Sequence, residues 1–360
     1  MPLRIVRTRA LPIGVDLGSS AVKLVQLRRG PEAMEIVAAA ARPVPASSRR
    51  PVRARLDFLA KTIRQIVKDG AFAGRRCVLS IPADDTFVQH VKLPAGGDED
   101  IPAALAEELR PKLPYPPEQA VIRHVVAGQI HGDGQARREV IAVCAPRERL
   151  EGYLAMARRC KLDVIAVNIE PCAIVECFGR LFRRAADAQR AALFVDLGSR
   201  STQVVLAHGS RIVFARNLPA GGDQLNEAVA RGLEISPEDA ARRRQALQGE
   251  GAEAADVDRV YGLLDAPVAA LAEELTQCLR YYESVFPNQR VERAIFVGGQ
   301  AHDRRLCQAI AQRLNLAAQV GDPLAGVRSG NPKHVELDRR TPQPDWAVAV
   351  GLGLGAQPAA

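Results

Sequence analysis

The chain has 360 residues, 47% apolar and 25% charged, which is typical of a soluble globular protein with room for two domains of ~150 residues each. The formal net charge is +8, but the arginines are scattered in pairs and only 4% of the residues are aromatic, which argues against a nucleic-acid-binding protein. No stretch reaches the ~18 uninterrupted apolar residues of a membrane span, and the seven cysteines show no disulfide or zinc-site spacing. A cytoplasmic protein is therefore expected.

The first part of the chain predicts half of a mixed α/β domain. The stretch from Gly14 to Val25, GVDLGSSAVKLV, reads as two strands joined by a Gly-Ser turn. A further strand is expected over Ala33–Ala40. Apolar residues then recur at helical spacing from Leu56 to Val67, and Cys77–Ile81 is expected to be a buried strand.

The next stretch, residues 84–166, is expected to be an inserted α/β subdomain, because strand and helix patterns alternate along it and a proline-rich break interrupts them. The expected elements are strand Phe87–Leu93, helix Glu99–Leu109, strands Ala120–Ala127 and Glu139–Ala145 with a loop over Gly128–Gly134, helix Pro146–Cys160 and strand Leu162–Val167.

The second part repeats the signals of the first. After a helical stretch, FVDLGSRSTQVV from Phe194 to Val205 predicts another hairpin. Ser236 followed by Pro237 predicts a helix start, since Ser is a good N-cap and Pro suits the first helical position. The other expected elements are helix Pro171–Phe182, strand Ile212–Ala215, a helix from Gly221 through Ala230, a long helix ending at Phe286, strand Val291–Val297 and helix Leu306–Leu314.

The two hairpins lie half a chain length apart, which predicts an internal duplication. Turns of small residues leave backbone N–H groups exposed, and these can bind a phosphate together with hydroxyls and an ammonium group. We expect Asp16 and Asp196 to be catalytic, to face each other across a cleft and to hold Mg²⁺ through water. The phosphate ligands expected at the two turns are Gly18, Ser19, Ser20 and Lys23, and Gly198, Ser199, Ser201 and Thr202.

A third turn follows strand Val291–Val297. Gly298 and Gly299 precede Gln300 at a strand-to-helix turn, where a backbone without side chains can approach a flat or anionic ligand beside the helix N-terminus. We expect these three residues to contact the ligand.

The order of the three turns resembles the actin/Hsp70/sugar-kinase ATPase superfamily. The inserted stretch, with EELRPKLPY from Glu107 to Tyr115, is similar to the extra subdomain of the FtsA-like branch. The resemblance is closest to the family of type IV pilus assembly protein PilM, which also has motifs like FARNLPAGG from Phe214 and LRYYES from Leu279 and a late helix like Trp346–Leu354. It spans residues 11–356 and implies an α/β, actin-like (ribonuclease H-like) two-lobed ATPase fold.

This fold implies a division of the chain into the following parts: an N-terminal extension, residues 1–10; a first lobe core, residues 11–83 and 167–188; an inserted α/β subdomain, residues 84–166; a second lobe core, residues 189–235 and 290–357; and a helical subdomain, residues 236–289.

The resemblance also implies that ATP and Mg²⁺ bind between the halves, with Gly221 and Gly222 among the ligands. The chain departs from the family on the adenosine side, where Ala-Glu-x-x-Lys is usual and AARRR stands from Ala240 to Arg244. The acid that would contact the ribose is missing at Ala241. We expect either that the nucleotide affinity is weak or that Asp239 and Arg244 contact the nucleotide in place of this acid.

The function implied is that of an ATP-binding scaffold of a type IV pilus or related secretion machine, peripheral at the inner membrane. Hydrolysis is expected to be slow or absent, since the sequence shows no general base beyond the two aspartates. The implied partner is the cytoplasmic N-terminal peptide of an inner-membrane protein such as PilN, bound in a groove between the insertion and the first lobe; self-association stays open.

Three alternatives remain within the superfamily. One is an FtsA-like division protein, against which the ending GLGAQPAA shows no amphipathic helix. Another is the actin-like component of a type II secretion system. The third is a small-molecule kinase, which would need a polar pocket for its phosphoryl acceptor, and the sequence identifies none.

Overall fold

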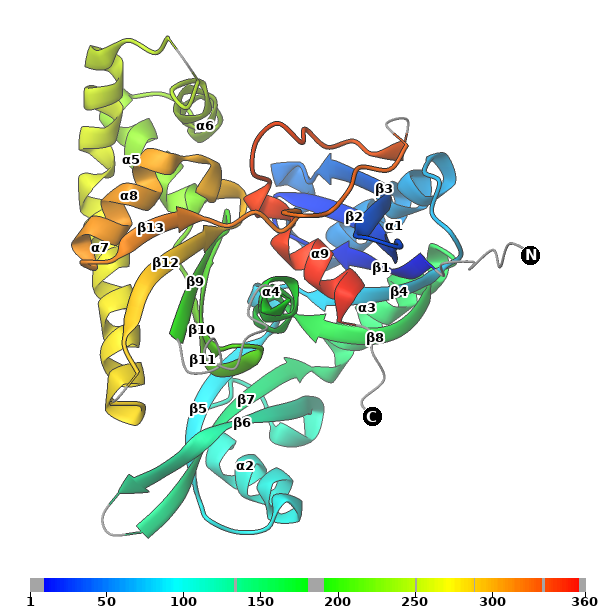
Figure 1. The fold of residues 1–360 in the computed structure, drawn as a ribbon, viewed down its shortest axis with the longest axis vertical. Coiled ribbons are helices and arrows are strands. Elements are labelled where there is room, and N and C mark those ends of the chain that lie inside the picture. The colour runs from blue at the N-terminus through cyan, green and yellow to red at the C-terminus, as the bar shows by residue number, and fades with distance from the viewer. Residues whose placement is uncertain are drawn as a thin grey trace. The chain divides into compact units, whose positions relative to one another are not determined.

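The computed structural model describes residues 10–132, 135–180, 191–249, 251–287, 289–331 and 334–355. The chain forms two compact units, whose elements are labelled in Figure 1. Unit 1 comprises Met1–Pro82, Glu148–Phe178 and Asp322–Ala360, and unit 2 comprises Ala83–Arg147 and Gly179–Gly321. The expected N-terminal extension lies outside the described residues except for Ala10.

Unit 1 is built on a five-stranded sheet with the order β3-β2-β1-β4-β8. The first three strands are antiparallel neighbours, and β4 and β8 run parallel to β1. The expected hairpin and the two strands that follow it are confirmed. The strands are β1 (Ala10–Asp16), β2 (Ala21–Arg29), β3 (Met34–Pro43), β4 (Arg76–Ile81) and β8 (Asp163–Ile169).

Two elements that were expected in the insertion, strand β8 and the helix before it, belong to unit 1. Strand β8 pairs in parallel with β4, so that Leu79 lies opposite Val167. Parallel neighbours need a long crossover connection, and helix α3 (Arg147–Arg159) is the last part of this one. The buried side chains of Tyr153 and Met156 on α3 contribute to the core of this unit.

Three further helices complete unit 1: α1 (Val52–Asp69), α4 (Glu170–Gly179) and α9 (Ala347–Leu354). The backbones of β1 and α9 meet closely, because a Cβ on Gly14 would lie 2.0 Å from Ala349 O. Gly351 allows α9 to pack closely on α4, because a Cβ on Gly351 would lie 1.8 Å from the carbonyl oxygen of Ala173. This packing places residues 322–354 in unit 1, whereas the sequence analysis assigned residues 290–357 to the second lobe.

Unit 2 repeats the sheet of unit 1, with the order β11-β10-β9-β12-β13. Again three antiparallel strands come first and two parallel strands follow. The shared order agrees with the duplication expected from the two hairpins. The strands are β9 (Ala191–Leu197), β10 (Thr202–His208), β11 (Arg211–Leu218), β12 (Val291–Val297) and β13 (Ala317–Val320).

Four helices pack with this sheet. They are α5 (Gly222–Leu233), α6 (Pro237–Ala246), α7 (Ala254–Val285) and α8 (Arg304–Arg313). The expected N-cap of α6 is confirmed, since Ser236 Oγ accepts the backbone N–H of Asp239 at 3.1 Å. None of the helices in the described ranges is long and apolar enough to cross a membrane.

A three-stranded sheet of order β5-β7-β6 forms the rest of unit 2, with helix α2 (Ile101–Leu109) packed on it. Its strands are β5 (Phe87–Pro94), β6 (Ala120–Gly132) and β7 (Gln135–Pro146). The loop start expected at Gly128 is wrong, because β6 continues through Gly128 to Gly132, and the last two residues of the expected loop, 133–134, lie outside the described residues. A register shift between Val126 and Gly128 allows this, since a bulge absorbs the glycine without ending the strand. We call this sheet the inserted sheet.

Candidate functional site

The first Gly-Ser turn joins β1 to β2 in unit 1. Asp16 is the last residue of β1, is 5% exposed and lies opposite Lys23 in the strand pair. A Cβ on Gly18 would lie 2.8 Å from Ala21 O, so this tight turn requires glycine. The N–H of Leu17 donates to Ser80 Oγ at 2.9 Å, which ties the turn to β4.

A buried arginine supports the same turn. Arg55 of α1 is 7% exposed and its Nη2 donates to Leu17 O at 2.6 Å and to Gly18 O at 3.1 Å. Arg55 is not among the site residues expected from the sequence. The signal was present, since Arg55 precedes Leu59 and Ile63 at four-residue spacing and therefore occupies the buried face of the helix.

Lys23, an expected phosphate ligand, contacts Asp345 just before α9. Its Nζ donates to Asp345 O at 2.6 Å and lies 3.3 Å from the carboxylate oxygen Oδ2. Asp345 was not expected at this position.

The charges around Asp16 act in opposite directions. Burial raises the pKa of the Asp16 carboxyl above its ordinary value, and the negative charge of Asp345 raises it further. The positive charges of Lys23 and Arg55 and a hydrogen bond with Ser80 oppose this shift. A cation near Asp16 would favour the ionised form for the same electrostatic reason.

The second Gly-Ser turn joins β9 to β10 in unit 2 and has the same construction. Asp196 is 9% exposed and lies opposite Gln203, the register position that Lys23 has in unit 1. A Cβ on Gly198 would lie 2.7 Å from Ser201 O. The hydroxyl of Thr202, an expected phosphate ligand, is buried and donates to Ala220 O at 2.7 Å, so it holds the backbone of the following turn.

Two more glycine turns of unit 2 gather at this hairpin. The N–H of Gly222 donates to Gly198 O at 2.9 Å, and the N–H of Asp223 donates to Ser199 O at 2.7 Å. Gly298 has a φ of +87°, and a Cβ there would lie 2.2 Å from Asp196 Oδ1. Unit 2 thus brings together the expected ligands at Gly198, Gly222 and Gly298.

Arg244 lies beside these turns. It is 4% exposed, and its guanidinium donates to Asn226 Oδ1 at 2.7 Å and to Gln300 Oε1 at 3.0 Å. Burial lowers the pKa of Arg244, which the negative charge of Asp303 opposes. Gln300 in turn lies against Gly222, where a Cβ would come within 2.5 Å of its side-chain carbon.

Asp239, the other residue expected on this side, has different neighbours. Its carboxylate accepts a hydrogen bond from the hydroxyl of Ser236 at 2.6 Å and pairs with Arg242 at the exposed start of α6. The hydrogen bond from Ser236 is the main cause that lowers the pKa of Asp239. The structure therefore places Arg244 and Gln300 together and Asp239 elsewhere on the helix.

The aspartates suit a water-mediated metal better than a direct protein cage. Within the described ranges, no three His, Cys, Asp or Glu side chains group as metal ligands. Mg²⁺ retains several waters and takes one or two carboxylates plus substrate phosphates, so buried carboxylates at strand ends fit it.

Three comparisons place the chain among known proteins. A family model described as "Type IV pilus assembly protein PilM" matches residues 14–357. A solved structure titled "PilM-PilN type IV pilus biogenesis complex" is similar over 96% of this chain and 99% of that chain, with a TM-score of 0.79 and 22% identity. The ethanolamine utilization protein EutJ from Carboxydothermus hydrogenoformans is similar over 97% of this chain and 90% of that chain, with a TM-score of 0.54 and 14% identity.

Proposed function

The chain belongs to the family of type IV pilus assembly protein PilM, and from this premise we propose that it is a nucleotide-binding scaffold of type IV pilus machinery. Its fold is the actin-like fold expected from the sequence. The proposal has two parts. One is binding of ATP with Mg²⁺ by the glycine turns, and the other is binding of a PilN-like inner-membrane protein.

The observation that carries the nucleotide proposal is the repeated construction of the two hairpins. In each unit a buried aspartate lies at the end of the first strand, and two positions later comes a glycine whose added Cβ would lie within 3 Å of a backbone carbonyl oxygen. A structural hairpin needs neither the buried carboxylate nor two further glycine turns packed beside it in unit 2. Phosphate binding uses all of these features, because backbone N–H groups contact the oxygens and the carboxylates hold the metal.

Each group then has a definite task. Lys23 neutralises phosphate charge in unit 1, and the N–H groups of the turns at Gly18 and Gly198 donate to phosphate oxygens. Mg²⁺ would supply charge neutralisation at the phosphates, held through water by Asp16 and Asp196. Arg244 and Gln300 serve the nucleoside side. With no further general base among the expected residues, turnover is slow or absent.

A titration with a fluorescent ATP analogue in the presence of Mg²⁺ tests this assignment. Asp16→Ala and Lys23→Ala should each weaken binding by about tenfold or more, since charge-assisted hydrogen bonds to phosphate are lost. Lys61→Ala is the matched control, because Lys61 is an exposed lysine of α1 in the same unit. Wild-type affinity in both site variants would refute the site.

The partner proposal rests on the inserted sheet. Its strand order β5-β7-β6 leaves β5 and β6 as edge strands within this sheet, and an edge strand can accept an extended peptide by strand addition. Family membership and the similarity to a complex that contains PilN support a PilN-like protein as that partner. Binding of its cytoplasmic N-terminal peptide would hold the chain at the inner membrane.

Amide hydrogen exchange with and without the peptide tests the partner proposal on the full chain. The peptide should slow exchange in β5 or β6, because strand addition gives their outward N–H groups new acceptors. A scrambled peptide of the same composition is the control. Peptide binding with protection only outside residues 84–166 would remove the inserted sheet from the interface.

A further inference from the structure

The second Gly-Ser turn of unit 2 is tied to the start of the inserted sheet by an ion pair. Arg200, between Ser199 and Ser201 of the turn, has its Nη1 on Asp84 Oδ2. Asp84 belongs to a single helical turn, Ala83–Asp85, that directly precedes β5. The guanidinium therefore lies between the expected phosphate turn and the chain segment that enters the inserted sheet.

A second connection joins the same two places through neutral groups. Gln203 Nε2 donates to Asn217 Oδ1 at 3.2 Å, and Asn217 Nδ2 donates to Ala83 O at 3.3 Å. Neither residue carries a charge, so an anion at the turn does not compete directly for this connection. The hydrogen bond from Asn217 therefore keeps Ala83 near β11 when a phosphate replaces Asp84 as the partner of Arg200.

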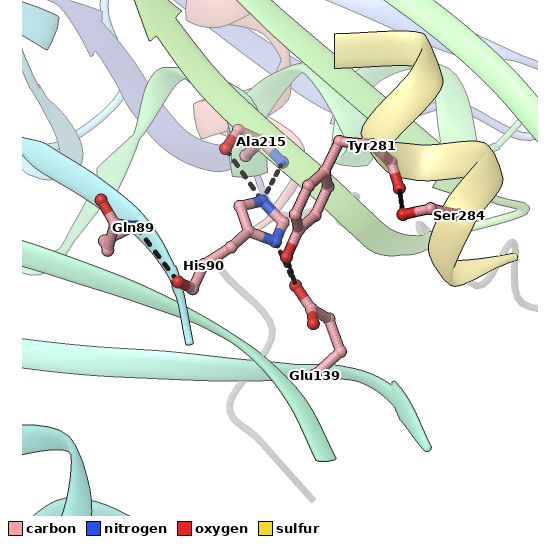
Figure 2. A network of polar contacts seen from close by, with 6 residues as sticks. All are labelled: Gln89, His90, Glu139, Ala215, Tyr281 and Ser284. Atoms are coloured by element: carbon pink, nitrogen blue, oxygen red, sulfur yellow. Dashed lines mark hydrogen bonds and ion pairs between the residues drawn. The ribbon is translucent and has the colours of Figure 1, made fainter. Parts of the chain in front are cut away.

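The inserted sheet is anchored more firmly a few residues further on, as Figure 2 shows. His90 of β5 has Nδ1 2.7 Å from Glu139 Oε1 and Nε2 3.2 Å from Ala215 O of β11. Tyr281 of α7 donates to the same Glu139 oxygen at 2.6 Å, and Glu139 is fully buried. The ring of His90 also stacks on Phe214, with 4.7 Å between ring centroids.

The Glu139 network and the Arg200–Asp84 ion pair differ in how easily a ligand can replace one of their partners. The network around Glu139 is buried, so breaking it would leave a buried charge without its partners, which is costly. The side chains of Arg200 and Asp84 are 24% and 37% exposed. An ion pair of this exposure contributes little net stability, and an arginine can form the same charge-assisted, bidentate hydrogen bonds with a phosphate as with a carboxylate, so a phosphate can compete for it.

We propose that Arg200 is a positioning residue that couples phosphate binding at the second turn to the entry of the inserted sheet. A phosphate bound at the turn competes with Asp84 for the guanidinium of Arg200. When Asp84 loses this ion pair, the segment 83–86 loses one of its contacts with the turn, while the hydrogen bonds around His90 stay in place. The inference rests on the proposed nucleotide site and adds a regulation of it. By linkage, a ligand that favours the Arg200–Asp84 pair weakens nucleotide binding by the same factor.

A double-mutant cycle on the full chain measures the competition, with MgATP as the titrant. Asp84→Asn should tighten MgATP binding by up to about fivefold, the range of an exposed ion pair, and Arg200→Ala should weaken it by about tenfold. In the Arg200→Ala background, Asp84→Asn should have no effect. Asp85→Asn makes the same charge change one residue along, and Arg216→Ala removes an exposed arginine of β11 that pairs with Glu274.

Hydrogen exchange supplies the second readout. MgATP should speed exchange of the amides of residues 83–87 in the wild type and leave them unchanged in Arg200→Ala. If Arg200→Ala fails to fold, Arg200→Gln carries the same cycle, since glutamine keeps a polar side chain but removes the charge that pairs with Asp84.

The outcomes separate the two levels of the proposal. If the wild type binds no MgATP, the proposed function and this inference both fail. If the wild type binds MgATP and Asp84→Asn changes the affinity by the same factor with and without Arg200, the proposed function stands and the coupling through Arg200 is refuted. A non-zero interaction energy with the exchange change in residues 83–87 supports the coupling.

Discussion

The ammonium group of Lys23 lies 3.3 Å from the carboxylate of Asp345, a residue 322 positions later in the chain. Their side chains are only 12% and 19% exposed, so the pair is largely shielded from water. We predict that Asp345→Ala lowers the free energy of unfolding by about 1–3 kcal/mol, because the shielded ammonium group of Lys23 loses one of its counter-charges.

Chemical denaturation of the single variants and the Lys23→Ala/Asp345→Ala double variant checks this prediction. The double variant should lose less than the sum of the single losses, as contacting charges do. Asp338→Ala, which breaks the exposed pair with Arg340, serves as the control and should have little effect. Additive losses would show that the Lys23–Asp345 contact contributes no coupling energy.

The buried carboxylate of Asp16 predicts a pH-dependent stability. Burial raises the folded-state pKa of Asp16, so the folded protein holds this proton more tightly than the unfolded chain does. The resulting contribution to the free energy of unfolding is fully present below the ordinary carboxyl pKa and is lost as the pH rises through the raised pKa. Asp16→Asn should therefore raise the unfolding temperature by roughly 2–5 °C at pH 7 in metal-free buffer. The gain should disappear below about pH 4.

Scanning calorimetry at several pH values, with Asp258→Asn as an exposed control on α7, measures this difference. A lower unfolding temperature for Asp16→Asn at pH 7 would mean that the carboxylate stabilises the fold instead.

Local patterns in the sequence were sufficient to predict both hairpins, the glycine turns and the N-cap at Ser236, since each depends on neighbouring residues. They could not predict that Lys23 meets Asp345, because nothing near either residue encodes a contact across the whole chain. The same limit explains why β8 was grouped with the insertion. Its partner β4 precedes that insertion, and the pairing depends on the crossover as a whole.

The site was only partly predictable for a related reason. Arg55 lies on the apolar face of α1, and a charged residue in such a place needs a buried hydrogen-bond acceptor. Its acceptors are the carbonyl oxygens of Leu17 and Gly18 in the turn after β1, which the helix pattern alone does not identify. Thr202 matches a phosphate-binding pattern, yet its hydroxyl donates to Ala220 O. A motif fixes the turn geometry, whereas the hydrogen-bond partner depends on packing.

The neighbouring glycines Gly298 and Gly299 offer a matched pair of substitutions. Gly298→Ala should lower the free energy of unfolding by about 1–3 kcal/mol, since φ is +87° and the added Cβ would meet Asp196 Oδ1 at 2.2 Å. Gly299 has no atom within 4 Å of its Cβ position, so Gly299→Ala should be nearly neutral. Urea denaturation compares the two; equal effects would contradict the close approach of Gly298 to Asp196.

His208 predicts a loss of stability in mild acid. Its Nε2 lies 2.8 Å from the hydroxyl oxygen of Tyr282, and burial lowers the pKa of His208 to about 4, with the charge of Arg211 adding to the shift. The unfolded state takes up a proton near pH ~6.5 that the folded state excludes, so stability present above that pH is lost as the pH falls towards 4. The expected loss between pH ~7 and ~5 is on the order of 1–2 kcal/mol.

Urea denaturation at pH 7 and pH 5 tests this, comparing wild type with His208→Gln. The variant should lose less stability than the wild type over this range. His302→Gln removes an exposed histidine and should lose as much free energy of unfolding between pH 7 and pH 5 as the wild type does. An identical pH dependence in His208→Gln and wild type would assign the acid sensitivity to other groups.

Both duplicated turns are proposed to contact the phosphates of a nucleotide. The most direct measurement is amide hydrogen exchange of the full chain with and without MgATP, followed at residues 17–23 and 198–202 in the same sample. We expect MgATP to slow exchange at both turns and Mg²⁺ alone to cause no change, because the turn N–H groups would donate to phosphate oxygens. Unchanged exchange at both turns at a MgATP concentration that saturates the protein would contradict it.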